Sequence, residues 1–292
     1  MIATLPDRTA WLAERQGGVG GSDAAAALGK SPWKSRFQLW SEKVGLVEPP
    51  DLSENEAVEW GLRLEGPIAI AYRERSGRRV EIEPRYTIRH HAEYDWLLAS
   101  LDATQEAEDK PGVGTLQIKT ASAWNDDDWK DEPPPYYQIQ LQHEMAAAGL
   151  QWGTLCVLIG GQKMRWFDQP RNETFIEAMI DQEQAFWLLV KSETAPEVDG
   201  SEETARILKA LYPIDNGESV ALPDDAAEWD TTLQGVVSLL GWGLLLKGAL
   251  FIVAPRFVEK GGAWEVKSKL VPVAGAALLI IGAYLTSIAY LG

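Results

Sequence analysis

One aspartate and a glutamine–lysine pair have residue types and a spacing that suit phosphate chemistry. Asp102 closes the apolar run "WLLASLD", and Gln117 and Lys119 lie two positions apart in "TLQIK". Side chains alternate along a strand, so Gln117 and Lys119 are expected on one face. Phosphodiesterases use carboxylates to hold Mg²⁺ or Mn²⁺ and a lysine to orient water or stabilise developing charge. A surface hairpin without chemistry is the default interpretation of this pattern taken alone. A phosphodiesterase hairpin, in which Asp102 ends the first strand, is the alternative.

The segments around these residues predict the scaffold that must position them. The glycine-rich stretch "GGVGGSDAAAALGK" predicts a short helix capped by Ser22 or Asp23. Helices followed by a run of strands, and then alternating helices and strands, predict an α/β fold with a central mixed β-sheet flanked by helices. Periodicity predicts further helices at 35–44, 53–77, 136–149 and 173–193, and strands at 79–90, 95–103, 113–121, 152–161 and 163–168.

Charge and cysteine content limit the class of protein. The net charge of −16 argues against nucleic-acid binding, unless arginines gather locally. Cys156 is the only cysteine, which excludes an intramolecular disulfide and a cysteine-based zinc site. The three histidines have no helical pair spacing, which favours structural roles. Residues 61–90 hold seven arginines, either a phosphate-tracking patch or a solvated helix face: Arg63, Arg73, Arg75, Arg78, Arg79, Arg85 and Arg89.

Five ordered motifs carry a resemblance to a known family. They are "AERQGGVGGSDAAAALGKSPWKSRFQLWSEKVG", "WGLRLEGPIAIAYRERSG", "SLDA", "LQIKT" and "YYQIQLQHEM". Together they resemble the YqaJ-type viral recombinases, phage exonucleases similar to lambda exonuclease within the PD-(D/E)xK nuclease class, over roughly residues 8 to 195. The resemblance implies a restriction-endonuclease-like fold and a two-metal enzyme that degrades one strand of linear duplex DNA from a 5′ end. It also implies a ring-shaped homotrimer, a single-strand annealing partner and a cytoplasmic location in a phage-infected or prophage-carrying bacterium.

The resemblance assigns roles to individual residues. Glu65 matches the helix carboxylate near the metals, Asp102 the principal metal-ligating aspartate and Lys119 the catalytic lysine. Gln140 matches a glutamine on the helix behind the site, where an amide can orient a ligand or a phosphate. Together with Gln117, these residues make up the expected catalytic set, in which Asp102, Glu65 and Gln117 are the expected ligands of Mg²⁺ or Mn²⁺.

A second pair matches the residues that receive the terminal 5′-phosphate. Arg15 and Ser22 lie seven positions apart, and a guanidinium with a hydroxyl beside a helix start can bind an anion. A plain helix cap is an equally good interpretation of Ser22, and the two roles are compatible. Gln138 and Gln142 lie two positions on either side of Gln140, so they are expected to face elsewhere on the helix.

Gln117 departs from the family pattern, which has a glutamate there. An amide oxygen can ligate Mg²⁺, but it offers a dipole in place of a charge, so metal affinity is expected to fall. Three explanations stay open: a tolerated variant in which Glu106, Glu108 or Asp109 helps to hold an ion, an introduced substitution that traps substrate, or a DNA-end-binding or scaffolding module that no longer cuts. An active or weakly active Mg²⁺-dependent deoxyribonuclease is the preferred interpretation.

The C-terminal end has a different character from the rest of the chain. We expect a nuclease domain at 1–215, an acidic linker at 216–233 and a hydrophobic helical hairpin at 234–292. The stretch 270–291 has no charged residue and is long enough to span a membrane. The basic loop of this hairpin would export the nuclease under the positive-inside rule. That conflict leaves three interpretations: a membrane hairpin with overridden orientation, a tail joined by fusion, frameshift or assembly error, or a buried hairpin that serves oligomer contacts.

Overall fold

The computed structural model describes residues 1–52, 54–211, 278, 280–281 and 284. Contacts divide the chain into two units, Met1–Ile214 and Asp215–Gly292, and the first unit contains every predicted site residue. The predicted linker and most of the predicted hairpin lie outside the described residues. Among the helices that the structure describes, none combines the length and the apolar character required to cross a bilayer.

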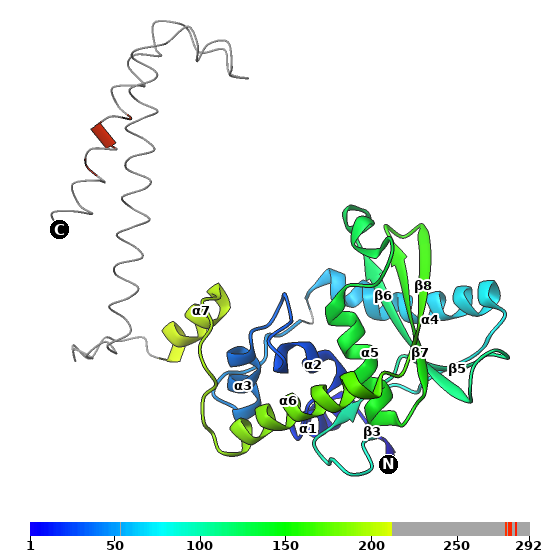
Figure 1. The fold of residues 1–292 in the computed structure, drawn as a ribbon, viewed down its shortest axis with the longest axis horizontal. Coiled ribbons are helices and arrows are strands. Elements are labelled where there is room, and N and C mark those ends of the chain that lie inside the picture. The colour runs from blue at the N-terminus through cyan, green and yellow to red at the C-terminus, as the bar shows by residue number, and fades with distance from the viewer. Residues whose placement is uncertain (53, 212–277, 279, 282–283, 285–292) are drawn as a thin grey trace, which may run out of the picture. The chain divides into compact units, whose positions relative to one another are not determined.

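A five-stranded mixed sheet forms the centre of the first unit (Figure 1). Its strand order is β2-β5-β6-β7-β8, and every neighbouring pair is antiparallel except β6 with β7. A parallel pair needs a crossover, which helix α5 supplies between β6 and β7. The predicted mixed sheet is confirmed. The strands are β2 (Arg79–Ile82), β5 (Ala103–Glu106), β6 (Val113–Ala121), β7 (Trp152–Ile159) and β8 (Lys163–Pro170).

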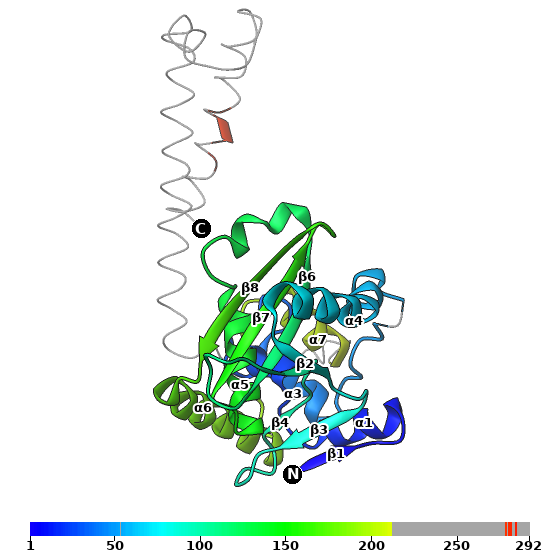
Figure 2. The same cartoon turned by 90° about the vertical axis from the view of Figure 1, so that its right-hand side faces the viewer.

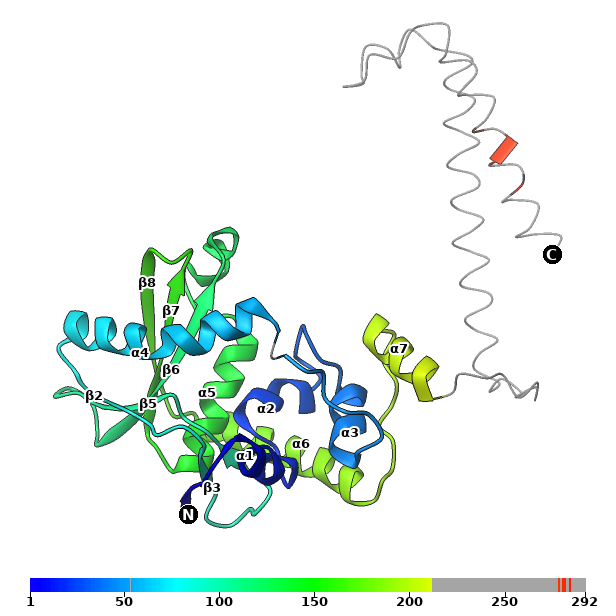
Figure 3. The ribbon, with the colours of Figure 1, turned by 180° about the vertical axis from the view of Figure 1, so that it is seen from behind.

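Two helices cover opposite faces of this sheet. Helix α4 (Glu56–Ser76) packs its Tyr72 against the face that carries Leu116, and α5 (Pro135–Ala148) packs its Leu141 against the face that carries Leu155. Figure 3 shows α4 crossing in front of the strands, with α5 on their other side. Alternation along β6 sends its apolar side chains toward α4 and leaves its polar ones on the face of α5.

A second core joins the helices α2, α3, α6 and α7 to strand β4 of a small sheet of order β1-β3-β4 (Figure 2). It contains the alanine-rich helix α2, whose small side chains let α5 approach closely. The elements are β1 (Ile2–Thr4), α1 (Arg8–Gln16), α2 (Gly21–Ala27), α3 (Arg36–Val44), β3 (Thr87–His90), β4 (Leu98–Ala99), α6 (Glu173–Lys191) and α7 (Glu202–Leu211), with short 3₁₀ turns η1 (Ala123–Asn125) and η2 (Asp127–Trp129).

Two strand predictions were wrong around the key aspartate. The run 79–90 forms β2 and β3 in different sheets, and only two residues of 95–103 form β4. Asp102 therefore does not end a strand; it immediately precedes β5. The reason is tertiary: the loop residue Val19 bonds through its backbone to Trp96 and Leu98, which draws the chain away from the central sheet before it returns at residue 103.

The predicted cap of the alanine-rich helix was also misplaced. Helix α2 begins at Gly21, with Gly20 as its N-cap. Asp23 is the third helical residue, and its carboxylate accepts a hydrogen bond from the Gly20 backbone N–H at 3.3 Å. Ser22 lies exposed in the first turn and is not the cap. Its hydroxyl is thereby left available for another partner.

Candidate active site

Asp102 and Gln117 meet beside the start of β5, halfway along β6. The Gln117 Nε2 donates a hydrogen bond to Asp102 Oδ2 at 2.9 Å, and the backbone N–H of Ile118 donates to the same oxygen at 2.7 Å. Burial raises the pKa of Asp102, although the positive charge of Lys119 and the Ile118 N–H oppose the rise. The Gln117 Oε1 is buried and accepts no hydrogen bond from any described residue. An unsatisfied oxygen beside a carboxylate is a suitable place for a cation.

Lys119 projects from the same face of β6 and reaches α5. Its Nζ donates to Gln140 Oε1 at 3.0 Å and lies 4.9 Å from the centroid of the Tyr137 ring. The Gln140 Nε2 in turn donates to Glu144 Oε1 at 2.9 Å. The lysine is thus held between an amide oxygen and an aromatic face of α5, with its ammonium group within electrostatic reach of Asp102.

Glu65 approaches the same region from α4. Burial and the nearby charge of Asp102 raise the pKa of Glu65 to about 7, against the lowering effect of Lys119 and Arg85. The charge of Asp102 thus acts on Glu65, which places the two carboxyl groups within electrostatic reach of each other. A divalent cation would supply positive charge to both.

Arg15 and Ser22, the two residues predicted to bind a 5′-phosphate, contact each other. The Arg15 Nη2 donates to Ser22 Oγ at 2.6 Å, and its guanidinium also lies 4.6 Å from the Trp11 ring centroid. Asp23 forms ion pairs with two basic residues next to Ser22. Its carboxylate lies 3.1 Å from Lys43 Nζ and 3.9 Å from Arg15 Nη2. Burial alone would raise the pKa of Asp23, but Lys43 and Arg15 hold it well below its usual range.

Helix α2 brings Arg15 and Ser22 close to α5, which carries Gln140 and Glu144. A Cβ added to Gly21 would lie 2.9 Å from Glu144 Oε1 and 3.4 Å from Gln140 Cγ, so only a glycine fits without displacement. Ser22 is the next residue along this helix. The two sets of predicted site residues are therefore neighbours, although the sequence separates them by about a hundred positions.

The donor set fits a hard divalent cation. Asp102, Glu65 and Gln117 offer oxygen atoms, which Mg²⁺ and Mn²⁺ prefer, and the buried Gln117 Oε1 lacks any other partner among the described residues. No described group of three or more His, Cys, Asp or Glu side chains has metal-binding geometry. Two of the three expected ligands are acids, and the third, Gln117, offers an amide oxygen.

Two of the acids proposed to replace the missing carboxylate, Glu106 and Asp109, pair with basic residues elsewhere. In the β5–β6 ladder, Ala103 pairs with Leu116 beside Asp102, whereas Glu106 pairs with Val113 at the far end of the hairpin. Glu106 contacts Arg79 there, and Asp109 contacts Lys110. Three residues at roughly 3.4 Å each separate Glu106 from Ala103. Glu106 therefore lies well away from Asp102 along the hairpin.

The other glutamines of α5 face elsewhere, as predicted. Gln138 donates to the Pro133 carbonyl at 2.6 Å, and Gln142 donates to the Pro170 carbonyl at 3.0 Å. His143 is likewise structural, since it is fully buried and its Nδ1 lies 2.8 Å from Glu183 Oε1. Burial would lower the His143 pKa, but the charge and hydrogen bond of Glu183 raise it to about 9.

The arginine-rich segment 61–90 is largely committed to internal ion pairs. Arg78 makes a bidentate contact with Asp168 across the sheet, at 2.7 and 2.6 Å. Arg63, Arg79 and Arg89 also face carboxylates, those of Glu59, Glu106 and Glu83. Much of the apparent basic patch is therefore neutralised within the fold.

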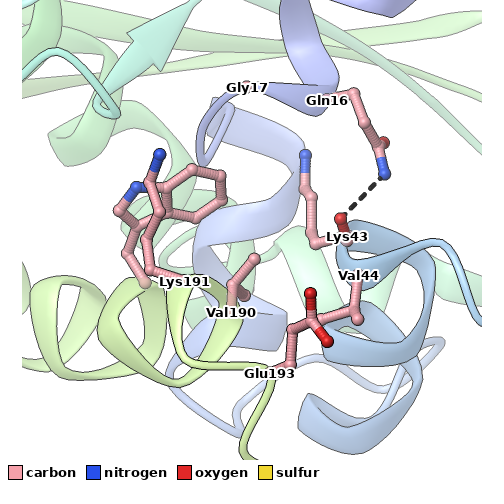
Figure 4. A pocket seen from close by; sticks show the side chains of 8 residues that line it. Gln16, Gly17, Lys43, Val44, Val190, Lys191 and Glu193 are labelled. Atoms are coloured by element: carbon pink, nitrogen blue, oxygen red, sulfur yellow. Dashed lines mark hydrogen bonds between the residues drawn. The ribbon is translucent and has the colours of Figure 1, made fainter.

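A surface hollow of about 280 Å³ lies apart from the carboxylate cluster (Figure 4). It is bounded by the end of α1 at Gln16, by Lys43 of α3 and by Lys191 of α6, and it contains none of the predicted catalytic residues. In it the Gln16 side chain donates to the Lys43 carbonyl at 3.1 Å. Lys43 itself turns its ammonium group toward Asp23 and the Arg15 carbonyl.

Sequence reasoning missed Glu144, the most deeply buried acid of the site. Its side chain has no exposed surface, and its Oε2 accepts no hydrogen bond from the described residues. Burial, with the charge of Asp102, raises the pKa of Glu144 to about 8. The available signal was its position four residues after Gln140, which puts both side chains on one helix face.

Comparisons with known proteins agree with this architecture. The YqaJ-like viral recombinase domain matches residues 10–151. An uncharacterized protein YqaJ from Bacillus subtilis (strain 168) is 37% identical over 209 residues, which cover 70% of this chain and 63% of that protein. The match thus spans less than two thirds of the length of this curated relative.

Solved structures give the fold. An alkaline exonuclease, LHK-Exo, from Laribacter hongkongensis has a TM-score of 0.54 at 23% identity, over 70% of this chain and all of that chain. LHK-Exo in complex with dAMP has the same TM-score at 24% identity, over 64% of this chain and 94% of that chain. Both likenesses concern the arrangement of the elements. Residues 10–151 of this chain thus match the YqaJ-like viral recombinase domain, and the solved exonucleases share the arrangement of its elements.

Proposed function

We propose that this protein is a Mg²⁺- or Mn²⁺-dependent exonuclease that degrades one strand of linear duplex DNA from a 5′ end. The convergence of Asp102, Gln117 and Lys119 beside the start of β5 carries the proposal, because Gln117 bonds directly to Asp102 and Lys119 lies within its electrostatic reach. The likeness to an alkaline exonuclease agrees with it at the level of the fold.

Asp102, Glu65 and the Gln117 carbonyl oxygen would hold the ion. When bound, a divalent ion of this class would polarise the scissile phosphate and make the attacking water more acidic. Lys119 would place a fixed positive charge beside the phosphate, where it stabilises the negative charge that develops during attack. Gln140 holds that ammonium group in place through its carbonyl oxygen.

Arg15 and Ser22 supply the proposed preference for the 5′ end of the DNA. Arg15 can offer two parallel N–H donors to a terminal 5′-phosphate, and the exposed Ser22 hydroxyl can add a third. Helix α2 is short, so its own terminus adds little, and we assign the recognition to the side chains. Because Gly21 touches Gln140 and Glu144, a terminal phosphate at Arg15 would lie close to the carboxylates.

The test is digestion of a linear duplex labelled at its 3′ ends, with a 5′-phosphate or a 5′-hydroxyl, in Mg²⁺, Mn²⁺ or chelator. We expect release of 5′-mononucleotides that depends on the ion. Lys119→Met should lower kcat by about 100-fold or more, because a charge aimed at the transition state is lost. Lys163→Met is the matched control, since Lys163 is half-exposed and pairs with Asp126 away from the site. Equal rates for wild type and Lys119→Met would contradict the proposal.

The 5′-phosphate role has its own variant. Arg15→Lys keeps the charge but removes the bidentate geometry, so KM should rise for the 5′-phosphate duplex and change little for the 5′-hydroxyl duplex. A KM that rises equally for both duplexes would show that Arg15 contacts the DNA without recognising its end.

A second function is favoured by one observation. The Gln117 amide occupies the position of a metal-ligating acid and bonds to Asp102, which suits a DNA-end-binding module that no longer cuts. Activity in Gln117→Glu but not in the wild type, in Mg²⁺ and in Mn²⁺, would establish this alternative. The single-strand annealing partner, the ring-shaped trimer, the bacterial cytoplasmic location and the membrane hairpin at 234–292 stay predictions from the sequence.

A further inference from the structure

The side-chain amide of Gln140 is held at both ends. Its Oε1 accepts the Lys119 ammonium at 3.0 Å, and its Nε2 donates to Glu144 Oε1 at 2.9 Å. A glutamine amide can turn over and exchange its oxygen for its nitrogen. Turned over, it would point two N–H donors at an ammonium group that can only donate. Something must keep the oxygen toward the lysine.

Glu144 is the group that fixes this orientation. An ionised carboxylate oxygen and an amide carbonyl oxygen are both acceptors, so they cannot form a hydrogen bond with each other. Glu144 therefore favours the arrangement in which the Gln140 nitrogen points toward it and the Gln140 oxygen points toward Lys119. A protonated Glu144 still has one accepting oxygen for the Gln140 nitrogen, whereas the ionised carboxylate can only accept and so excludes the turned-over amide.

The surroundings hold Glu144 itself in one place. Its side chain is fully buried, and Gly21 of α2 leaves the gap in which its carboxyl group lies. His143, its neighbour in sequence, is bonded to Glu183 and to the Leu98 carbonyl and so gives Glu144 no direct hydrogen bond. The Glu144 Oε2 accepts none from any described residue. Burying a carboxyl group that has only one hydrogen-bond partner lowers the free energy of unfolding, so such a group in a folded protein calls for an explanation.

We propose that Glu144 is a positioning residue for the nuclease reaction: it fixes the Gln140 amide so that its oxygen holds the Lys119 ammonium group at the scissile phosphate. This rests on the proposed function. Glu144 makes no contact with DNA or ion in this role and acts only through Gln140. Removing it lets the amide rotate, and Lys119 then loses its fixed acceptor.

The experiment compares Glu144→Met with Glu144→Gln in the full chain, on the 3′-labelled 5′-phosphate duplex. Glu144→Met has a similar length but no acceptor, and its kcat should fall by about 10- to 100-fold while KM stays within about 2-fold. Glu144→Gln keeps an oxygen that can face Gln140, so it should retain kcat within about 3-fold. Wild-type kcat in Glu144→Met, or equal loss in both variants, would overturn the inference.

A double-mutant cycle separates this role from direct participation. In the Gln140→Leu background, adding Glu144→Met should change kcat by less than about 2-fold, because the residue through which Glu144 acts is already gone. A further loss of about 10-fold would show that Glu144 acts by itself, for example on the ion, and would overturn the inference. Should Glu144→Met fail to fold, Gly21→Ala displaces the same carboxyl group with one methyl, and an unchanged kcat in Gly21→Ala would count against the inference.

A measurement without turnover keeps the two proposals apart. In ¹H–¹⁵N NMR spectra, the side-chain amide of Gln140 should shift toward the position of a free amide in Glu144→Met and stay near its wild-type position in Glu144→Gln. A wild type that digests nothing in either ion would refute the proposed function alone. Unchanged Gln140 amide resonances in Glu144→Met would refute the inference whether or not the protein is a nuclease.

Discussion

Replacing Gln117 by glutamate tests the site most directly, because it changes one atom at a contact that the structure defines. In the wild type the Gln117 amide donates to Asp102 Oδ2 at 2.9 Å. Gln117→Glu replaces that donor with a second acceptor. Without metal, two carboxylates then face each other in a buried place, and the Asp102 pKa is already raised by burial.

The size of the effect follows from this contact. Two unit charges about 4 Å apart repel by about 4 kcal/mol at an effective dielectric constant of 20. Losing a hydrogen bond to a charged group costs a further ~1.5 to 3 kcal/mol. Proton uptake by one carboxyl relieves part of this sum, so we expect the free energy of unfolding of metal-free Gln117→Glu to be lower by roughly 2 to 4 kcal/mol at pH 8. For a unit of this size, that is on the order of 10 °C in Tm.

A divalent ion should reverse the loss. Bound between the two carboxylates, it converts repulsion into attraction, and a free concentration 100 times the Kd stabilises the folded state by about 2.7 kcal/mol. Thermal unfolding of wild type and Gln117→Glu in chelator and across a Mg²⁺ series measures this. Gln117→Glu should begin less stable and approach or pass the wild type as Mg²⁺ rises, and its nuclease activity should exceed that of the wild type.

Gln142→Glu is the matched control for a buried glutamine. Its amide donates to the Pro170 carbonyl, with no carboxylate as acceptor. It should lose stability without regaining it in Mg²⁺. The reasoning about the site is refuted if metal-free Gln117→Glu is as stable as the wild type, or if Mg²⁺ stabilises Gln117→Glu no more than Gln142→Glu.

Two further predictions concern stability. The ion pair of His143 with Glu183 raises the His143 pKa to about 9 against burial, so its contribution to stability is fully present below about pH 6.5 and is lost as pH rises through about 9. Urea unfolding across this window should show that the free energy of unfolding falls by a few kcal/mol in the wild type and not in His143→Met. A flat profile in the wild type would contradict this prediction. Gly18→Ala should destabilise the protein by about 3 kcal/mol or more, because the added Cβ would lie 2.3 Å from the Trp96 carbonyl oxygen. Gly66→Ala in α4 meets nothing within 4 Å, so it should be neutral or stabilising by about 0.5 to 1 kcal/mol. Equal Tm changes for the two variants would refute this prediction.

Local pattern was sufficient where a segment obeys one rule along its length. Val113–Ala121 forms one strand as expected, because Leu116 and Ile118 alternate with polar residues and pack toward α4. Helix α3 begins after its serine cap at Ser35 and ends at Gly45, whose φ of 82° suits a glycine. The residues near Asp102 obey no such rule, since their backbone partners lie about eighty positions away at Val19.

The sequence alone determined the types of chemical group and the periodicity that puts Gln117 and Lys119 on one face of a strand. It determined little about which acids join them. Glu106 is nearer in sequence to Asp102 yet lies at the other end of the hairpin, while Glu144 arrives from a crossover helix and enters because Gly21 leaves room for it. Alternation and helical repeat are local properties of the backbone, whereas the approach of two helices depends on side-chain volumes far apart in the chain, so only the tertiary structure decided the membership of the site.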